Sequence, residues 1–343
     1  MTAPTLAHAD RAWPVRVSAS GHRSERGPGA PLAVVLILLA LAGATRAGAA
    51  GAWNTYLRPT IYTDLVAAHD TVWCATADAG LLAFDRTNGA FSSYTRDPSA
   101  LASNHLTSLA FAPNGVLWIG TRDAGVSRLS RNGSWGVLDG YVGMPSLTVN
   151  TLRAAGDTLW IGTDNGLALF DGTDITGVLG ASGSPSPFAS GDITGVAVLG
   201  DSLWVSTGAG VYYSRLSGGL ATWTATPTGL PGGRVDALGT DGRDVWALAI
   251  NRLWIAQGGD RWAIVPQLST VYSLSDDYGR VAAATDAGVF VWSSPVWTQA
   301  NPALISLGPA RFNFATGADP TGARFAANVD GIHAQQPAGG SWS

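Results

Sequence analysis

Short apolar segments that end beside a Gly turn recur along the chain at a nearly constant interval. Three copies, at residues 117–121, 159–163 and 203–207, read Leu-Trp-Ile/Val-Gly/Ser-Thr, and close variants stand at 72–76 and 245–249. Their tryptophans follow one another at steps of 42 to 45 residues: Trp73, Trp118, Trp160, Trp204 and Trp246. A constant period of this length is typical of a repeated supersecondary unit that holds about four short strands.

Each unit predicts four strands. An apolar first strand such as 106–111 precedes the Trp strand, and a turn of the form Asp-x-Gly follows it, as at 123–125 and 164–166. Such turns supply the positive φ that tight hairpins need. A third strand and an aromatic fourth strand complete the unit: residues 91–94, Trp135, Trp223, Trp262 and Trp297. The fixed period favours a β-propeller over a sandwich. The nearly all-apolar Trp strands indicate burial on both faces.

Two less regular copies, 281–285 and 324–328, hold Ala282 and Phe325 in the Trp position. The sequence thus predicts an all-β fold, a seven-bladed β-propeller over residues 53–343. Because a propeller must leave no open strand edge, we expect residues 53–57 to pair into the last blade and close the ring. Residues 339–343 also resemble the start of a fourth strand. Either these residues stay unpaired or the chain is truncated at its carboxy terminus. The incomplete strand motif favours truncation.

The repeat also makes packing predictions. Gly120 and Gly162, in the Trp strands, are expected to leave room for a large ring from a neighbouring blade. Residues 174–190, rich in Gly, Ser and Pro, are expected to form a long surface loop. Small residues at equivalent positions of the first strands suit strands that are crowded around a central axis: Ser108, Thr151, Gly195, Ala237 and Ser273.

The first 49 residues differ from the rest. Four arginines precede an apolar run at 32–42, and Ala47-Gly48-Ala49 follows as a cleavage site. A basic region, a short apolar core and an A-x-A exit indicate a secretory signal peptide, here with an extended basic leader. The run is short for a bilayer, which needs about 20 apolar residues, and Arg46 interrupts it. A retained anchor is the alternative. The chain is therefore expected to be extracytoplasmic, either periplasmic or secreted.

Charge and cysteine content restrict the partners. Residues 1–49 contain five of the 20 basic and two of the 24 acidic residues, so the remainder has a formal net charge near −7. The chain has no Lys, and Glu25 is its one Glu. An acidic surface argues against nucleic acid, and against a membrane once the signal is cleaved. Cys74, the one cysteine, excludes an intrachain disulfide and is expected to be buried. The oligomeric state stays open.

The repeat resembles a known family. The order Leu-x-Ser-Asn, then Asn/Asp-Gly-x-Leu-Trp-Ile-Gly-Thr, then Gly and an apolar residue is followed at 101–106, 114–121 and 125–126, and again at 157–167. It resembles the two-component regulator propeller repeat, over roughly residues 53–335. The resemblance implies an extracytoplasmic sensor region of a hybrid histidine kinase, or a secreted ring such as a surface component of the type IX secretion machinery. The family repeat carries no catalytic residue.

The sequence offers little catalytic chemistry. Beyond the signal peptide three histidines remain, each in a different repeat: His69, His105 and His333. No HxxH, HExxH or Cys-His cluster is present, so we predict no metal site and no cofactor. A glycosidase would have to use Asp as both acid and base, because no Glu follows position 49. Calcium at 171–174 or 241–244 would lack a full set of oxygen ligands.

Geometry predicts where binding would occur. In a four-stranded meander, the turn between the second and third strands shares a face with the crossover to the next blade. Loops on a rigid scaffold usually carry binding residues. The candidate ligand-binding residues on this face are Asp78, His105, Arg122, Asp123, Asp164, Asn165, Asp286 and Asp330. The alternatives are turn formation for the Asp residues and a local salt bridge for Arg122.

We therefore expect a secreted or periplasmic β-propeller that acts as a non-catalytic ligand-sensing or protein-interaction module. Its partner would be a small ligand, with saccharides among the candidates, or an envelope or secretion protein. The alternative is a carbohydrate-active hydrolase or lyase on the same scaffold, which predicts carboxylates that converge with Arg or Tyr in a central pocket. A purely structural adaptor would show a large exposed apolar patch.

The signal peptide is testable. In a bacterial host with an export pathway, the chain should be cleaved after Ala49, because the A-x-A exit is the cleavage signature. Amino-terminal sequencing of the exported protein should then begin at Ala50. Recovery of the intact chain from the membrane fraction would instead support the retained anchor.

Overall fold

The computed structural model describes residues 53–56, residues 61–301 without 98, 140–142, 227–228, 258–260 and 278, and residues 315–318, 324–328 and 331–335. Two units are distinguished, Met1–Gly48 and Ala49–Ser343. The first unit, with the expected signal peptide, lies outside the described residues. Everything below concerns the second unit.

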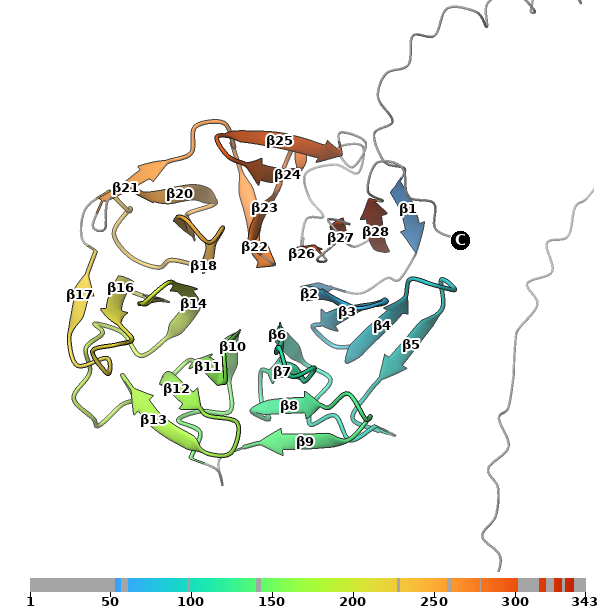
Figure 1. Cartoon of the computed structure of the whole chain (residues 1–343), viewed down its shortest axis with the longest axis horizontal. Helices are drawn as coiled ribbons and strands as arrows, with labels where there is room; N and C mark the ends of the chain where they lie inside the picture. Colours follow the sequence, from blue (N-terminus) through green and yellow to red (C-terminus); the bar gives the residue numbers. More distant parts are fainter. Residues whose placement is uncertain are drawn as a thin grey trace, which may run out of the picture. The chain divides into compact units, whose positions relative to one another are not determined.

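The described strands form seven four-stranded antiparallel sheets arranged around a common centre, and in the six sheets built from consecutive strands the first strand is innermost (Figure 1). The predicted all-β propeller is confirmed. Six sheets each use four consecutive strands, and we number them as blades 1 to 6.

The bounds of the first three blades are as follows. Blade 1 contains β2 (Tyr62–Ala68), β3 (Thr71–Thr76), β4 (Leu81–Asp85) and β5 (Phe91–Tyr94). Blade 2 contains β6 (Leu106–Phe111), β7 (Leu117–Thr121), β8 (Val126–Leu129) and β9 (Trp135–Leu138). Blade 3 contains β10 (Val149–Ala155), β11 (Thr158–Thr163), β12 (Gly166–Phe170) and β13 (Ile175–Leu179).

The remaining blades repeat this order. Blade 4 contains β14 (Ile193–Leu199), β15 (Ser202–Thr207), β16 (Gly210–Arg215) and β17 (Trp223–Ala225). Blade 5 contains β18 (Ala237–Thr240), β19 (Val245–Ala249), β20 (Arg252–Gln257) and β21 (Arg261–Ile264). Blade 6 contains β22 (Val271–Asp277), β23 (Arg280–Thr285), β24 (Gly288–Ser293) and β25 (Val296–Asn301).

The closing sheet joins strands from far apart in the sequence. It combines β26 (Ala315–Ala318), β27 (Arg324–Asn328) and β28 (Gly331–Gln335) with β1 (Trp53–Tyr56). β1 runs antiparallel to β28, with Trp53 opposite Gln335 and Tyr56 opposite Ile332. The expected pairing into the last sheet is therefore confirmed for residues 53–56. The expectation for residues 339–343 lies outside the described residues.

The Trp strands are buried on both faces, as predicted. Every residue of β7 and β19 is buried, and so are all but the first residue of β11 and β15. The repeat tryptophans of blades 2 to 5 keep 5%, 4%, 6% and 0% of their surface exposed. Trp73 of blade 1 differs, because it is only half-buried. Cys74 beside it is fully buried, as expected for a core cysteine.

In five of the six blades numbered above, a Thr ends the second strand and holds the following turn, whereas β19 of blade 5 ends in Ala249. Thr121 Oγ1 donates to Gly125 O at 2.8 Å and accepts from Ala124 N at 2.9 Å. Thr76, Thr163, Thr207 and Thr285 make the equivalent bonds in their own blades. The glycines of these turns have positive φ, as the Asp-x-Gly pattern predicted. The repeat therefore uses Thr hydroxyls, where we had expected Asp side chains, to hold the turn.

A β-bulge near the start of the first strand recurs in five blades and ties three of them to the next blade. The register shifts by one residue in β2, β6, β10, β14 and β22. A bulge re-aims the extra side chain. In three blades this side chain donates to a carbonyl of the next blade: Thr63 to Leu106 (3.1 Å), Asn150 to Ile193 (2.9 Å) and Thr194 to Val235 (2.5 Å). Thr107, at the same position, has no hydrogen-bond partner among the described residues.

Two packing predictions were wrong. The space at Gly162 is filled by branched side chains, because a Cβ there would lie 2.5 Å from Thr151 Cγ2 and 2.8 Å from Ile193 Cγ2. At Gly120 the nearest atom is Val149 Cγ1, at 2.8 Å. No large ring occupies either space. The expected loop 174–190 contains β13, whose alternating half-buried and exposed residues were hidden by the Gly-rich composition.

The small residues of the first strands do lie around the centre, as predicted. Their positions alternate with larger side chains that pack into the neighbouring blades. The small set Ser108, Thr151, Gly195, Ala237 and Ser273 lines a central channel.

The close approach of blades 3 and 4 at Gly162 is testable. Gly162→Val should lower the free energy of unfolding by about 1–3 kcal/mol, because its side chain would overlap Thr151 and Ile193. Gly232→Ala is the matched control, since nothing lies within 4 Å of a Cβ there. Urea denaturation measures both. Equal stability of the two variants would contradict the packing described here.

Candidate functional site

The face that carries the turns between second and third strands, together with the crossovers between blades, is called the crossover face; the opposite side is the hairpin face. Seven of the eight candidate residues lie on the crossover face. Asp78, Arg122, Asp123, Asp164, Asn165 and Asp286 occupy the turns, and His105 occupies a crossover. Asp330 lies outside the described residues.

The structure does not bring these seven residues together, because they belong to four different blades. Several of them are engaged locally. His105 Nδ1 lies 2.9 Å from Ala77 O, and Asp286 Oδ1 accepts from Ser269 Oγ at 2.8 Å. Asn165 accepts through Oδ1 from the backbone and side chain of Ser182 and donates to Pro145 O. Arg122 and Asp123 are exposed, and Arg122 has no ion pair with a described residue.

A central channel is the better-defined site. Its cavity, about 300 Å³, is lined by the first strands of blades 1 to 6. The bulge residues and their blade 5 equivalent form a polar ring at the crossover face: Thr63, Thr107, Asn150, Thr194, Asp236 and Tyr272. Two residues further along each strand an apolar ring follows: Leu65, Leu109, Leu152, Val196, Leu238 and Leu274.

An ion pair spans the channel toward the hairpin face. Arg153 of blade 3 reaches Asp276 of blade 6 on the opposite side, with Nη1 to Oδ1 at 2.7 Å and Nη2 to Oδ2 at 2.5 Å. Asp276 Oδ2 also accepts from Thr240 N of blade 5 at 2.9 Å. The charge of Asp276 raises the pKa of Arg153 above its usual value. This bidentate pair joins three blades and fixes the guanidinium across the axis.

Asp64 is a titratable carboxyl in the channel wall. Burial raises its pKa to about 7, and the charge of Asp276 adds to the increase. The backbone N–H groups of Leu65 and Leu109 oppose the shift, because they donate to its two oxygens at 2.8 and 2.7 Å. The bond to Leu109 joins blade 1 to blade 2. Asp64 is therefore held in place while its proton equilibrates near neutral pH.

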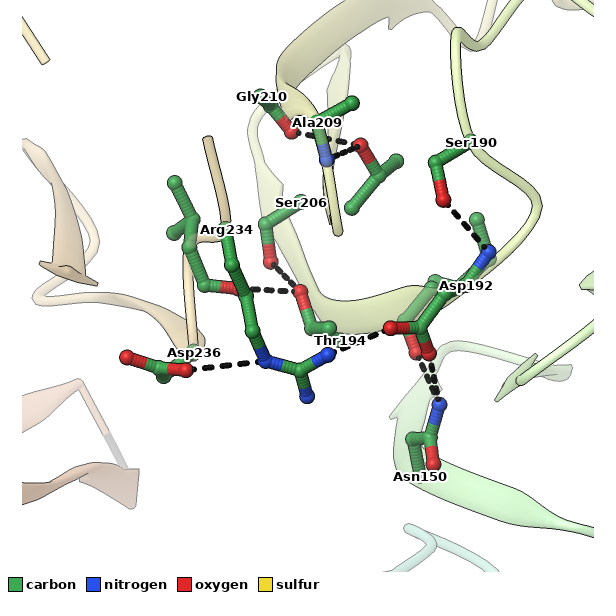
Figure 2. Close-up of polar contacts among 12 residues, drawn as sticks. Asn150, Ser190, Asp192, Thr194, Ser206, Ala209, Gly210, Arg234 and Asp236 are labelled. Atoms are coloured by element: carbon green, nitrogen blue, oxygen red, sulfur yellow. Dashed lines mark hydrogen bonds and ion pairs between the residues drawn. The ribbon is translucent and has the colours of Figure 1, made fainter. Parts of the chain in front are cut away.

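Charged and polar groups gather at the channel mouth on the crossover face. Figure 2 shows Arg234 between two carboxylates: its Nη1 donates to Asp192 Oδ2 at 2.5 Å and its Nε to Asp236 Oδ1 at 3.1 Å. Asn150 Nδ2 donates to Asp192 Oδ1 at 2.9 Å. Arg234 is 55% exposed, so this group, which we call the mouth cluster, faces solvent. It spans blades 3 to 5.

The mouth cluster suits recognition of a polar ligand. It presents carboxylate acceptors, guanidinium donors and an amide within one connected network, and the two carboxylates offset the arginine charge. Within the described residues no group of three or more His, Cys, Asp or Glu is placed to hold a metal ion. At the two segments considered for calcium, Asp171 and Asp241 accept backbone N–H bonds of their own turns.

The residues of the channel were missed at the level of sequence. Asp64, Arg153, Asp192, Arg234 and Asp276 stand in no motif. A signal did exist for the polar ring, because its members recur with the repeat period near the start of each first strand. Thr63, Thr107, Asn150 and Thr194 stand second in their strands, and Asp236 stands just before β18. Aligning the repeats on the first strand, and not only on Trp, would have found them.

Comparison with known proteins supports the repeat assignment. Residues 100–123 match the family described as Two component regulator propeller, so the chain carries this repeat. The sequence has no match among curated proteins.

Solved structures share the fold. PorZ, described as an essential bacterial surface component of the type-IX secretion system of Porphyromonas gingivalis, is 20% identical with a TM-score of 0.66, over 84% of this chain and 38% of that one. An extracellular domain described as belonging to the hybrid two component system BT3049 of B. thetaiotaomicron is 16% identical with a TM-score of 0.66, over 84% and 41%. This chain thus spans about two fifths of their lengths.

An enzyme also shares the fold. A streptogramin B lyase is 11% identical with a TM-score of 0.63, over 83% of this chain and 97% of that one. At these identities the likeness establishes the propeller and no particular activity. Among the described residues, no helix is long and apolar enough to cross a membrane.

The titration of Asp64 gives a pH prediction. The folded state keeps the Asp64 proton up to about pH 7, whereas the unfolded state loses it near 3.8. The free energy of unfolding should therefore fall as pH rises from 4 to 7. The Asp64→Asn variant lacks this titratable carboxyl, so its free energy of unfolding should lack this pH-dependent contribution. Relative to this variant, wild type should lose on the order of 2 kcal/mol over that range in urea denaturation. Parallel pH profiles would contradict the shifted pKa.

Proposed function

We propose that this protein is an extracytoplasmic, non-catalytic binding module that receives its ligand at the channel mouth on the crossover face. The mouth cluster carries the proposal: Arg234 is held between Asp192 and Asp236 in a solvent-facing network that spans three blades. Binding sites are commonly concave and use a few convergent polar groups to orient the ligand. The candidate residues of the surrounding turns, such as Arg122, Asp123 and Asp164, would form the outer part of the same surface.

The chemistry of the mouth favours a neutral, hydroxyl-rich ligand. Two carboxylates flank the single guanidinium, so an anion gains little there, and Asn150 adds a donor and acceptor pair. A small saccharide has the matching donors and acceptors. The solved structures described as the extracellular domain of a hybrid two component system and as a surface component of a secretion system support an extracytoplasmic role.

An envelope or secretion protein is the other partner that this face can take. Three of the large apolar side chains exposed among the described residues lie on the crossover face: Ile61 (45%), Leu147 (39%) and Ile250 (67%). Ile250 has φ 45°, an outlier for a β-branched residue. Strain of this kind persists where the surroundings over-determine it and is often found at binding surfaces.

A carbohydrate-active hydrolase or lyase is the second candidate, and one observation favours it. Asp64, with its pKa near 7, lies in a cavity that Asp236, Arg153 and Tyr272 also line. Shifted carboxyl pKa values are typical of catalytic acids and bases. Against this, backbone N–H groups occupy both oxygens of Asp64, and Asp276 occupies Arg153. These groups are explained by their structural roles, so we favour binding without catalysis.

Calorimetric titration with a panel of neutral oligosaccharides tests the proposal. At least one should bind, and Arg234→Gln should weaken that binding at least about tenfold, because a charge-assisted bond contributes roughly 1.5 kcal/mol or more. Arg215→Gln is the matched control, since Arg215 pairs with Asp201 on the hairpin face. Equal loss in both variants, or binding unaffected by Arg234→Gln, would contradict a site at the mouth.

The same mixtures test for catalysis. After long incubation, chromatography should recover every oligosaccharide unchanged. Product formation that disappears in Asp64→Asn and persists in Arg215→Gln would establish the enzyme instead.

A further inference from the structure

A second, chemically different cleft lies between blades 1 and 2. It is on the hairpin face, whereas the mouth cluster is on the crossover face. It has a volume of about 300 Å³ and is walled by aromatic side chains. Trp73, Tyr94 and Trp135 follow one another with ring centroids 5.9 and 5.7 Å apart. Phe111 and His69 meet edge to face at 5.8 Å on another wall. Four of these rings pack against one core cluster yet remain half-buried, whereas the fifth, that of His69, is exposed.

Comparison with the next blade explains why the cleft is open. The repeat tryptophan of blade 2, Trp118, is 5% exposed, and the ring of Phe170 covers it edge to face at 5.4 Å. Phe170 ends the third strand of blade 3 opposite Leu159. The equivalent residue of blade 2 is Leu129, which ends its third strand opposite Leu117. Blade 1 therefore presents Trp73 to a leucine where blade 2 presents Trp118 to a phenylalanine. The cleft lies beside this leucine, with Trp73, Leu129 and Trp135 among its lining residues.

The rim of the cleft is cationic. His69 and Arg131 line it, and none of its lining residues is acidic, although the chain as a whole carries more acidic than basic residues. Arg131 is exposed, lies across Gly115 and forms no ion pair with a described residue. An anionic group at the rim would therefore meet an unopposed guanidinium.

The backbone at His69 gives an independent indication. His69 has φ 54° in the turn between β2 and β3. The same turn position holds Gly156 in blade 3 and Gly200 in blade 4, with φ 59° and 57°. This left-handed conformation disfavours any residue with a Cβ. A histidine is thus placed on the cleft at a position where blades 3 and 4 use glycine, and such local strain is typical of functional positions.

We propose that this cleft binds a small aromatic carboxylate, with the ring stacked against Trp73 in the place that Phe170 takes in the next blade, and the carboxylate beside Arg131. Offset or edge-on aromatic contacts supply the affinity for the ring. The arginine supplies selectivity for the acid. The site is separate from the mouth cluster, so a test of one proposal does not test the other.

Phenylacetate is the probe, titrated into the full chain and followed by calorimetry and ligand-observed NMR. We expect saturable binding, and at least tenfold weaker binding of phenylacetamide, which has the same ring and no charge. Arg131→Gln should cause a similar loss for phenylacetate, while Arg215→Gln, at a comparably exposed arginine, should leave its affinity unchanged.

Leu129→Phe separates ligand binding from folding. It places in blade 2 the side chain that blade 3 has at the equivalent position, so it should fill the cleft and abolish phenylacetate binding without lowering the thermal unfolding midpoint. Arg234→Gln, at the mouth cluster, should bind phenylacetate as wild type does.

Three results would overturn the proposal. The first is no saturation by phenylacetate at 10 mM, a concentration of about ten times the millimolar affinity expected of so small a ligand. The second is equal affinity of the wild-type protein for phenylacetate and phenylacetamide, or equal affinity of wild type and Leu129→Phe for phenylacetate. The third is tighter binding of N-acetylglycyl-phenylalanine, which carries the same ring and carboxylate on a peptide; that would assign the cleft to the carboxy terminus of a protein.

Discussion

The Trp strands within blades 2 to 5 are buried on both faces, and this constraint governs the rest of the structure. A sheet of that kind is stable only when another sheet covers each face, so a row of such blades must close on itself. β1, from the start of the propeller, meets that requirement by pairing with β28 near its end. The closure is a contact between segments almost 280 residues apart. It places the two ends of the repeat array in one sheet, so that neither end leaves an open edge.

Closure of the ring also determines which side chains can lie at its central axis. The first strands converge there, so their side chains must be small, or be turned into the next blade by a bulge, as Thr63, Asn150 and Thr194 are. What remains is a channel with a polar mouth, an apolar middle and the Arg153–Asp276 ion pair toward the far end. The buried position of Asp64 in this wall raises its pKa, because a charged carboxylate is poorly solvated there. The chemistry of the channel is a consequence of packing seven sheets around one line.

Departures from the repeat point to the surfaces that differ from the rest. Where the rule holds, the repeat Trp is buried, Thr caps the turn and glycine occupies the left-handed positions. Trp73 is half-buried where its counterparts are covered, and His69 stands where other blades have glycine. Ile250 is exposed and strained in a turn that reads Asp-x-Gly in blades 1, 2, 3 and 6. Each departure lowers stability locally, and the packing of the surrounding blades offsets this loss.

The sequence by itself determined the local pattern and the fold that follows from it. The period of the Trp strands, the Asp-x-Gly turns and the two-sided burial are written into contiguous residues, and even the closing role of residues 53–57 could be predicted from a lone strand. It also placed the eight candidate residues on one face, where the seven described ones lie. It did not indicate that they would lie apart, each in its own turn, because the spacing between blades is set by the ring and not by the chain.

Only the tertiary structure decided which residues meet. Arg153 and Asp276 are 123 positions apart, and Arg234 reaches Asp192 across 42, so neither pair leaves a mark in any local window. The filling of Gly162 by Ile193, and not by an aromatic ring, likewise depends on how two blades approach. Local pattern fixes the blade because hydrogen bonding and side-chain alternation act between near neighbours. The sites arise between blades, where contact depends on the closed ring as a whole.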